Sequence, residues 1–495
     1  MKKLNVVLVV PNYRWADDDD HTYWIYVPYG ICLLASMVED ICNVTIIDSY
    51  VDNMTEKELS NKIKESDPDI VGFTCLMDQY GSTGHKVAEL VKNIDSNIIT
   101  IYGGVYATIN PFIVVKDSNV DFVAVGEGEF LLRDFILHFS GNGELPSKGL
   151  VYKKDNKVIN QGASEMIKVL DDLPRPSYHL IDMPKYINHK PREKTIGAPP
   201  ELPYFRMLTS RGCPYGCTFC QIEAISGKKV RFMSPEKVLD ELEWLKAEYG
   251  IKSFVIADDN FFIKKPRVKK ILQGLIDRDM QLSWIAEDAA IWMLDANVLE
   301  LMSKSGCEFV GLAIESGTKR VLEEIVQGKP IDYDQSKDIV NICKKLNIYT
   351  SANFIIGFPS ETWTEIRATL TYAEELDADY TRIFAAIPLK NTKLWDLAVE
   401  HDSFKEGYNH YDGSSSWSTG QLETKDFNAD DLTILRAFEW DRINFKTKEK
   451  EEKTAKQIGV TLEELMQIRK ETLTGAISKV GKVNNEYNND TFVKQ

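Results

Sequence analysis

Short apolar runs alternate with amphipathic stretches along the first 140 residues. The apolar runs predict strands, and the stretches between them predict helices, for example over residues 55–66 and 85–93. Continuously apolar strands that alternate with helices indicate a parallel sheet covered on both faces. Five such strands favour a flavodoxin-like (Rossmann-type) open sheet, which binds ligands at the carboxyl ends of its strands. The expected strands are Asn5–Val10, Val44–Asp48, Ile70–Cys75, Ile98–Tyr102 and Phe122–Val125.

A second alternating series runs from about residue 201 to residue 400. Ser234 followed by Pro235 is typical of a helix start within it. Six strand–helix units are fewer than the eight of a closed barrel, so we expect a partial, TIM-like (β/α)6 barrel. Its chemistry should lie at the carboxyl ends of the strands. The expected strands are Tyr204–Thr209, Ser253–Ala257, Leu282–Ala286, Phe309–Ile314, Ser351–Ile356 and Thr381–Ala385.

The remaining segments predict a connector and a helical end. Residues 141–200 contain an expected hairpin at Val151–Asn160 with its turn at Asp155-Asn156, then a Pro-rich breaker at 173–176. After residue 400, the patterns at 430–442 and 461–473 predict helices, and the polar tail 484–495 is expected to be disordered. The predicted organisation is therefore 1–140, 141–200, 201–400 and 401–495.

Composition narrows the class of protein. The chain has 495 residues and a net charge of −16, which argues against nucleic acid as the main partner. No apolar run reaches the roughly 18–20 residues that span a bilayer. The basic tip and apolar run at Leu4–Val10 are not followed by a small-residue cleavage site, so we read them as a buried strand. We expect a cytoplasmic protein without a membrane partner.

Three of the eight cysteines, Cys213, Cys217 and Cys220, fall within eight positions directly after a predicted strand. Gly212 and Gly216 allow the tight turns that let three thiolates converge. Thiolates are the usual ligands of iron–sulfur clusters, and three of them leave one iron of a four-iron cubane open to bind and activate a substrate. The alternative is structural zinc, which normally takes four ligands in paired C-x2-C knuckles. No fourth Cys or His lies near this triplet.

The C-x3-C-x2-C spacing, with aromatic Phe219 before the last cysteine, resembles the radical S-adenosylmethionine (SAM) superfamily. The resemblance implies that the three cysteines hold a 4Fe-4S cluster whose open iron chelates the amino and carboxylate groups of SAM. An electron, from an external donor such as flavodoxin or ferredoxin, then splits the sulfonium to a 5′-deoxyadenosyl radical. The SAM contacts that the resemblance implies are Phe219, Asp259, Glu315, Ser316, Asn353, Gly357 and Glu361.

Each of these polar positions also has a simpler explanation. Asp258 and Asp259 could cap the next helix, Glu315 could be a surface charge, and Gly357-Phe358-Pro359 could be only a turn. Their shared placement after predicted strands favours the site.

Glycines follow two strands of the first series, in Gly103–Thr108 and Gly126–Glu129. Glycine at a strand end permits close approach of a ligand to the backbone. With Pro28–Gly30 and Thr74–Gly84, this order resembles the cobalamin-binding domain that precedes many radical SAM domains. The D-x-H-x-x-G ligand motif is absent, so we expect no protein histidine on the cobalt, and position 106 is Tyr where relatives often have His. The implied cobalamin contacts are Tyr29, Gly30, Thr74, Gly103, Gly104, Tyr106, Ala107, Gly126, Glu127 and Gly128.

Three functions remain open within this resemblance. The first is a cobalamin-dependent radical SAM methyltransferase that acts on an unactivated carbon of a small molecule. The second is a cyclase, oxidoreductase or rearrangement enzyme with the same cofactors and no net methylation. The third is a methylthiotransferase, whose second cluster would need Cys32, Cys42 and Cys75, although buried structural thiols explain these better. A non-enzymatic cobalamin or metal sensor has little need for an open iron, and nothing in the sequence selects the substrate.

Two further segments have open roles. The loop 12–26, with Trp15, the acidic run 17–20, His21 and Trp24, could cover cobalamin, contact substrate or be a solvated acidic loop. Residues 440–445 could pack on the barrel opening and shape specificity, although ordinary helix packing explains their aromatics.

Overall fold

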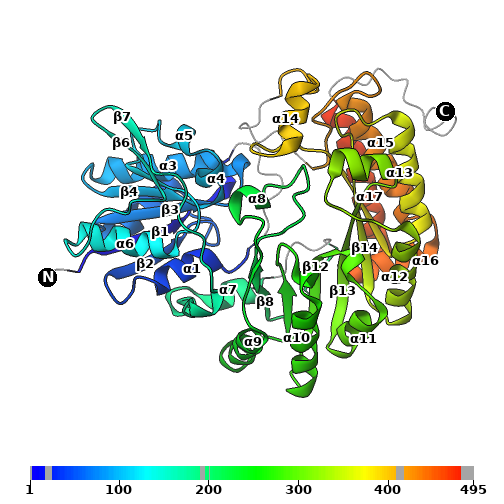
Figure 1. Ribbon diagram of the computed structural model, residues 1–495, viewed down its shortest axis with the longest axis horizontal. Helices are drawn as coiled ribbons and strands as arrows, with labels where there is room; N and C mark the ends of the chain where they lie inside the picture. The colour runs from blue at the N-terminus through cyan, green and yellow to red at the C-terminus, as the bar shows by residue number, and fades with distance from the viewer. Residues whose placement is uncertain (1–2, 17–24, 190–195, 200, 409–416, 481–495) are drawn as a thin grey trace. The chain divides into compact units, whose positions relative to one another are not determined.

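The computed structural model describes residues 3–16, 25–189, 196–199, 201–408 and 417–480, which form two compact units (Figure 1). The first unit comprises the described residues up to 189 together with 224–233. The second comprises 196–199, 201–223, 234–408 and 417–480. Residues 141–189, expected as a connector, therefore fold with the first unit. None of the helices in the described ranges has the length and hydropathy of a membrane span.

The first unit contains a seven-stranded sheet of order β2-β1-β3-β4-β5-β6-β7. The first five strands are parallel and have the flavodoxin-like order, which confirms the expected fold. They are apolar throughout because helices cover both faces, and Val6 to Val9 are almost fully buried. The strands are β1 (Asn5–Val10), β2 (Asn43–Asp48), β3 (Ile70–Cys75), β4 (Ile99–Gly103), β5 (Phe122–Ala124), β6 (Leu150–Lys154) and β7 (Lys157–Asn160), with the short β10 (Arg231–Phe232) also in this unit.

The hairpin expected in the connector forms, but it extends this sheet. Asp155 and Asn156 both have positive φ, of 49° and 60°, as a tight two-residue hairpin turn requires. Strand β6 pairs antiparallel with β5, so the last parallel strand gains a partner on its outer edge. The sequence pattern predicts the hairpin, but it does not predict which strand of the sheet the hairpin pairs with.

Local signals account for several helices of the first unit. Thr55 and Glu58 form a reciprocal capping box at the start of α2, with a Thr55 N to Glu58 Oε2 distance of 2.8 Å. The helices are α1 (Tyr29–Ser36), α2 (Glu56–Glu65), α3 (Gly81–Ile94), α4 (Gly104–Ile109), α5 (Pro111–Val114), α6 (Glu129–Phe139) and α7 (Met183–Ile187).

The second unit contains six parallel strands in the sequential order β8-β11-β12-β13-β14-β15, which confirms the partial barrel. Residues of β13 and β14 such as Leu312 and Phe354 point to the helices, and the alternate residues point to the opposite, inner face. The strands are β8 (Tyr204–Met207), β11 (Ser253–Ile256), β12 (Ser283–Ala290), β13 (Cys307–Glu315), β14 (Tyr349–Ile356) and β15 (Tyr380–Ala385), with the short β9 (Ser210–Arg211).

Helices cover the outer face of this sheet. Helix α9 begins as expected: Ser234 Oγ accepts a hydrogen bond from Lys237 N at 3.2 Å, and Pro235 is the first helical residue. The helices are α9 (Pro235–Tyr249), α10 (Lys265–Asp277), α11 (Ala296–Lys304), α12 (Tyr333–Lys345), α13 (Trp363–Leu376) and α14 (Lys393–Glu400), with α8 (Ile222–Ile225) where the units meet in sequence and a π-helical turn at Val321–Val326.

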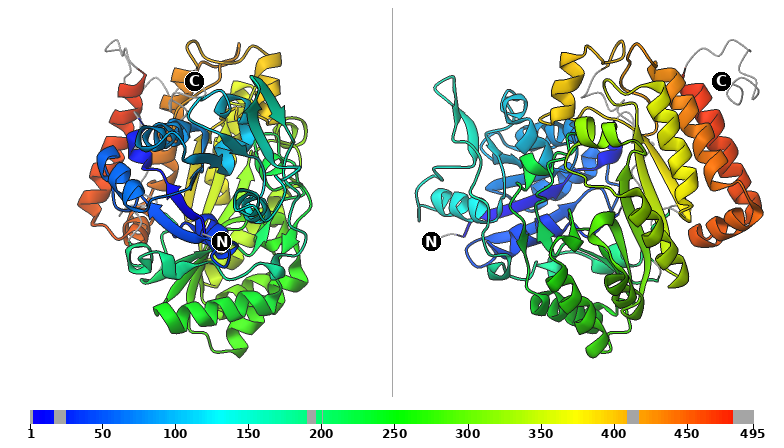
Figure 2. Two further views of the ribbon diagram at one scale, coloured as in Figure 1. Left: turned by 90° about the vertical axis from the view of Figure 1, so that its left-hand side faces the viewer. Right: turned by 45° about the vertical axis from the view of Figure 1, so that its right-hand side comes forward.

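The C-terminal region is helical as expected, with three helices: α15 (Ala429–Asn444), α16 (Lys448–Ile458) and α17 (Leu462–Lys479). Helix α15 lies along β15 and beside α13 (Figure 2). The side chain of Asn444 accepts from Thr381 N at 2.7 Å and donates to Thr381 O at 2.8 Å. Trp440 donates to Tyr380 at the amino end of β15, so ordinary helix packing accounts for this aromatic residue. Leu432 of the same helix lies against Gly357, after the carboxyl end of β14, and a role of the C-terminal segment in specificity stays a prediction. The polar tail 484–495 lies outside the described residues.

Candidate functional site

The loop with the three cysteines follows β8 and β9, and two carboxylates from the next strand hold it. Thr209 N donates to Asp258 Oδ1 at 2.5 Å, and Ser210 Oγ donates to Asp258 Oδ2 at 2.6 Å. Gly212 N donates to Asp259 Oδ2 at 2.7 Å. Lys264 occupies the N-cap position of helix α10, and the two aspartates bond to the cysteine loop, so the capping explanation for them is wrong. The aspartates organise the cysteine loop.

The loop turns as the glycines predict, and its sulfurs have accessible surface. Gly212 and Gly216 have φ of 94° and 64°, in the left-handed region that favours glycine. Cys213, Cys217 and Cys220 are half-buried, whereas the other five cysteines are buried. Burial raises the pKa of all three thiols, that of Cys217 to about 12. A bound metal would deprotonate them outright.

The arrangement of these thiols bears on the choice between zinc and a cluster. Across the described ranges, no group of three or more His, Cys, Asp and Glu side chains is placed to hold a single metal ion. Zinc needs four ligands around one centre, within about 2.3 Å of it for sulfur. A cubane instead spreads its cysteine ligands over separate irons. The spacing of three cysteines, with no fourth Cys or His nearby in the sequence, still favours a cubane over a mononuclear zinc site.

A buried ion pair lies beside the cysteines. Lys329 donates to the carboxylate of Glu315, and the side chain of each is 8% exposed. The Lys329 ammonium lowers the pKa of each cluster cysteine, partly opposing the effect of burial. Its nitrogen also lies 5.7 Å from the ring centre of Phe219. The surface-charge explanation for Glu315 is therefore wrong.

Lys329 was not among the residues expected from the sequence. It follows the π-helical turn Val321–Val326 and precedes a proline, so no strand end or periodic pattern marks it. An unpaired carboxylate at Glu315 would be costly to bury, and only that energetic requirement indicates a nearby cation.

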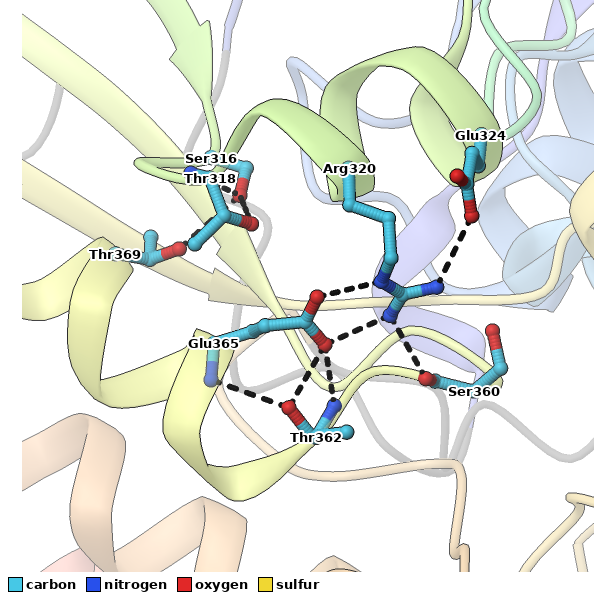
Figure 3. A network of polar contacts seen from close by, with 8 residues as sticks. All are labelled: Ser316, Thr318, Arg320, Glu324, Ser360, Thr362, Glu365 and Thr369. Carbon is cyan, nitrogen blue, oxygen red and sulfur yellow. Dashed lines mark hydrogen bonds and ion pairs between the residues drawn. The ribbon is translucent and has the colours of Figure 1, made fainter.

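A network of polar contacts ties the turn after β13 to the turn after β14 (Figure 3). Arg320 donates to both oxygens of Glu365, at 2.5 and 2.7 Å, and to Ser360 O at 3.0 Å. The Arg320 guanidinium is the main cause that lowers the pKa of Glu365 to about 2. Thr362 and Glu365 form the capping box of α13. The first turn of α13 therefore holds both turns in place, through Glu365 and its bonds to Arg320.

Two of the expected SAM residues lie inside these turns and are fully buried. The hydroxyl of Ser316 contacts those of Thr318 and Thr369, at 3.3 and 3.1 Å. Glu361 Oε2 accepts from Gly357 N at 2.7 Å and from Phe358 N at 3.0 Å. Gly357 has φ of 85°, so the turn needs glycine there. Ser316 and Glu361 shape the turns, and contact with SAM stays a prediction for both.

Asn353 lies on the inner face of β14. Its amide donates to Asp288 on β12 at 2.7 Å, across the intervening strand β13. A separate surface cavity is lined by residues at the amino ends of β12 and β13, among them Leu282, Ser283 and Gly306. It lies at the opposite end of the strands from the cysteines, so we assign the chemistry to the carboxyl ends.

In the first unit, several expected cobalamin residues form an accessible edge at the carboxyl ends of the strands. Gly104 has φ of 88° and is exposed, and a Cβ there would overlap Thr74 Oγ1 and Cys75 O. A Cβ at Gly30 would meet no atom within 4 Å, and a Cβ at Gly103 would meet only Ala124 Cβ, at 3.5 Å. The close backbone approach that a flat ligand needs is therefore present at this edge.

The side chains of other expected cobalamin residues are buried or bonded to other residues of the protein. Ala107 is fully buried, and the ring of Tyr106 packs on Tyr102 and His85, with centroid distances of 5.8 and 6.1 Å. Glu127 accepts from Arg231 at 2.7 Å with each oxygen, and Oε2 also accepts from Ile167 N at 2.6 Å. Their roles here are structural, and direct contact with cobalamin stays a prediction. The remaining positions, Tyr29, Gly126 and Gly128, are half-buried.

Cys32, Cys42 and Cys75 behave as structural thiols. All three are buried, and Cys42 and Cys75 donate to backbone oxygens at 3.3 and 3.0 Å. Burial raises the pKa of Cys42 to about 11. Of the acidic loop 12–26, residues 17–24 lie outside the described ranges.

Family models match both units. Residues 21–136 match the B12 binding domain, and residues 207–373 match the radical SAM superfamily. A fold of this order, with three cysteines at the head of a partial barrel, defines a radical SAM enzyme with a B12-binding domain.

Relatives extend this match over most of the chain. An uncharacterized methyltransferase of Pyrococcus horikoshii is 36% identical over 377 residues, which cover 76% of this chain and 79% of the relative. The chain belongs to the cobalamin-dependent radical SAM enzymes, whose cofactors are a 4Fe-4S cluster, SAM and cobalamin. An anaerobic magnesium-protoporphyrin IX monomethyl ester cyclase of Rubrivivax gelatinosus is 26% identical and covers 76% of this chain and 66% of the cyclase.

A solved structure supports the fold over nearly the whole chain. The radical SAM methyltransferase TsrM of Kitasatospora setae, with cobalamin and a [4Fe-4S] cluster bound, matches with a TM-score of 0.67 and 16% identity. The match covers 97% of this chain and 100% of that one. At this identity the likeness establishes the architecture.

Proposed function

We propose that this enzyme is a cobalamin-dependent radical SAM methyltransferase that acts on an unactivated carbon of a small-molecule substrate. The observation that carries the proposal is the half-buried triplet Cys213, Cys217 and Cys220 beside the buried Glu315–Lys329 pair, in a chain that also has a B12-binding domain. The 36% identical relative is named a methyltransferase, which favours methyl transfer over the other reactions of this family.

In this proposal the cofactors, when bound, would supply the bond-breaking chemistry, which is reductive cleavage of SAM at the cluster and methyl transfer through cobalamin. The chain binds and orients them. Cys213, Cys217 and Cys220 hold three irons, and Asp258 and Asp259 fix the loop that presents them.

Glu315 and Lys329 present opposite charges where the amino-acid end of SAM would lie. The carboxylate suits the amino group of SAM, and the ammonium suits its carboxylate. Phe219 offers a ring face for the adenine. Because both charges are 8% exposed, their interactions with a zwitterion would be little screened by water.

The first unit would hold cobalamin over the exposed glycine edge formed by Gly30, Gly103 and Gly104, with Thr74 beside it. We assign no protein histidine to the cobalt. An external reductant such as flavodoxin or ferredoxin would supply electrons to the cluster, because a radical is generated only from the reduced cluster.

Anaerobic turnover with methyl-labelled SAM tests the proposal. Candidate substrates are incubated with the reconstituted enzyme and a reductant, and we expect the label in a product one methyl group heavier than the substrate. Formation of 5′-deoxyadenosine with an unlabelled, cyclised or oxidised product would instead establish the second reaction class, for which the cyclase relative is the precedent.

A further inference from the structure

The inner face of the second sheet contains an irregularity that redirects two carboxylates. The register between β12 and β13 shifts between Ala286 and Ala289, so Glu287 and Asp288 occupy a bulge. Gly311 lies opposite it on β13, and a Cβ at this position would overlap the carbonyl oxygen of Glu287. Bulges commonly reorient side chains next to active sites. Here the bulge and the glycine together let Asp288 reach across β13 to β14.

Asp288 lies deep in the unit and is nevertheless exposed. Its burial among protein atoms raises the pKa of its carboxyl to about 6, although the nearby Arg382 guanidinium lowers it. The residue still has a large accessible surface. The carboxylate is therefore accessible to a ligand. Its protein partner is the Asn353 amide, 2.7 Å away, and within the described ranges it forms no ion pair.

Two buried polar atoms on β14 have no hydrogen-bond partner among the described residues. They are the carboxamide oxygen of Asn353 and the hydroxyl of Ser351, which lies on the same face. Turning the Asn353 amide over would set its oxygen against Asp288, so the donor to Asp288 is the nitrogen. An unpaired buried acceptor is destabilising, so the Asn353 amide is held in this orientation by its bond to Asp288. The exposed Asp288 carboxylate is the acceptor that is open to a donor from outside the chain.

The guanidinium of Arg382 lies on the side of Asn353 opposite to Asp288. Arg382 on β15 is the strand partner of Asn353 and lies on the same face. One of its nitrogens donates to Ile196 O at 2.5 Å, which leaves further N–H groups of the guanidinium. The other inner-face charges are paired: Arg206 donates to both oxygens of Glu287, at 3.1 and 2.6 Å, and Lys329 pairs with Glu315. Asp288 and Arg382 carry opposite charges on either side of Asn353, and neither forms a direct ion pair with another described residue.

We propose that Asp288 and Arg382, on either side of Asn353, form a recognition site for a zwitterionic, amino-acid-like head group of the substrate. Its ammonium donates to Asp288, which the Asn353 amide positions, and its carboxylate accepts from Arg382. This inference deepens the proposed function, since it names the substrate class of the same enzyme. The three side chains bind and orient, and no proton or electron moves.

Three matched probes test the site. L-norvaline has both charges, butylamine lacks the carboxylate, and pentanoate lacks the amine. Binding is measured by saturation-transfer NMR on holoenzyme reconstituted with cluster and cobalamin and saturated with S-adenosylhomocysteine, which keeps the amino acid out of the SAM site. We expect norvaline to bind about tenfold or more tightly than either truncated probe, since each charged hydrogen bond contributes about 1.5–3 kcal/mol.

Two variants test whether Asp288 binds the ammonium and Arg382 binds the carboxylate. Asp288→Asn keeps the shape and should reduce norvaline affinity to about that of pentanoate, whereas Arg382→Met should reduce it to about that of butylamine. Asp277→Asn, an exposed carboxylate at the end of α10, is the control and should change nothing. Equal binding of the three probes, no binding of any, or unchanged selectivity in Asp288→Asn with native circular dichroism would overturn the assignment. Failure of the methyl-label experiment would leave these binding results intact, so the two proposals fail separately.

Discussion

Lys329 and Glu315 form an ion pair in which each side chain is only 8% exposed, next to the half-buried cluster cysteines. Removing one partner of a buried pair leaves an uncompensated charge and costs about 3–5 kcal/mol. We therefore expect Lys329→Met to lower the free energy of unfolding in urea by about that amount at neutral pH. It should also weaken S-adenosylhomocysteine binding, measured by equilibrium dialysis.

The double variant Glu315→Gln/Lys329→Met separates these two effects. It should recover most of the lost stability, because no buried charge remains, but not the affinity. Lys337→Met is the control: it removes a solvent-exposed pair with Glu375 and should cost under about 1 kcal/mol. Full affinity in the double variant would contradict a role for the pair in binding SAM.

The cysteine triplet gives a prediction on metal content. Any of Cys213→Ala, Cys217→Ala and Cys220→Ala should prevent stable assembly of the cluster, since each removes one of three protein ligands. Iron and acid-labile sulfide, quantified after anaerobic reconstitution, should fall from about four per chain toward zero. The triple variant Cys32→Ala/Cys42→Ala/Cys75→Ala should keep about four irons, whereas a drop from about eight to four would reveal the second cluster of a methylthiotransferase.

Glu361 should make stability depend on pH around neutrality. Its carboxyl is fully buried, one oxygen has no partner, and burial raises its pKa to about 8. The folded state thus binds the proton more tightly than the unfolded chain does. The resulting stabilisation is complete below an ordinary carboxyl pKa of about 4.3 and is lost as the pH rises through about 8. Glu361→Gln should flatten unfolding free energy against pH between 6 and 8, by up to roughly 1.4 kcal/mol per pH unit.

Glu365 is the matched comparison, because it lies in the same turn with the opposite shift. Its pKa is lowered to about 2 mainly by hydrogen bonds from Arg320, so its stabilisation is present above about 4.3 and lost as the pH falls toward 2. Glu365→Gln should change stability over the neutral range by a constant amount and leave the slope there unchanged. Identical slopes for wild type and Glu361→Gln between pH 6 and 8 would show that the Glu361 carboxyl is not perturbed.

Gly104 tests the cobalamin edge. A methyl group there would overlap Thr74 and Cys75 and so force a shift at the edge that we assign to cobalamin. We expect Gly104→Ala to reduce cobalamin retained after gel filtration several-fold, as read from the absorbance of the bound cofactor. Gly141→Ala has the same positive φ but open space around the Cβ, so it reports the backbone cost alone and should retain cobalamin.

Gly311 tests the bulge that places Asp288. Alanine there would overlap the Glu287 carbonyl, and overpacking of this kind costs about 1–3 kcal/mol. We expect Gly311→Ala to lower the midpoint of urea unfolding and to abolish the preference for norvaline over pentanoate. Gly475→Ala, in helix α17 with nothing near the new methyl, should instead stabilise by about 0.5–1 kcal/mol. A Gly311→Ala variant that keeps both properties would show that the bulge does not need glycine.

Patterns along the chain are enough to predict the strands and the order of the two domains, and they mark three cysteines as the candidate metal centre. Asn5–Val10 and Ile70–Cys75 were located to the residue, and the other strands of the two series to within a few residues, because a continuously apolar run of that length can hardly be anything but a buried strand. Cys213, Cys217 and Cys220 were equally plain, since their spacing is local and their chemistry follows from the residue type.

Tertiary structure alone decided which segments meet. No local pattern shows that the hairpin at Leu150–Asn160 joins β5, or that Glu127 pairs with Arg231 more than 100 positions away. Lys329 and Asp288 were missed for the same reason: one comes from a turn and the other from a bulge, and each acquires its role from a buried charge or a strand that the chain brings beside it. Periodicity and spacing encode what neighbours in sequence do, whereas the pairing of buried charges is settled only when distant segments pack.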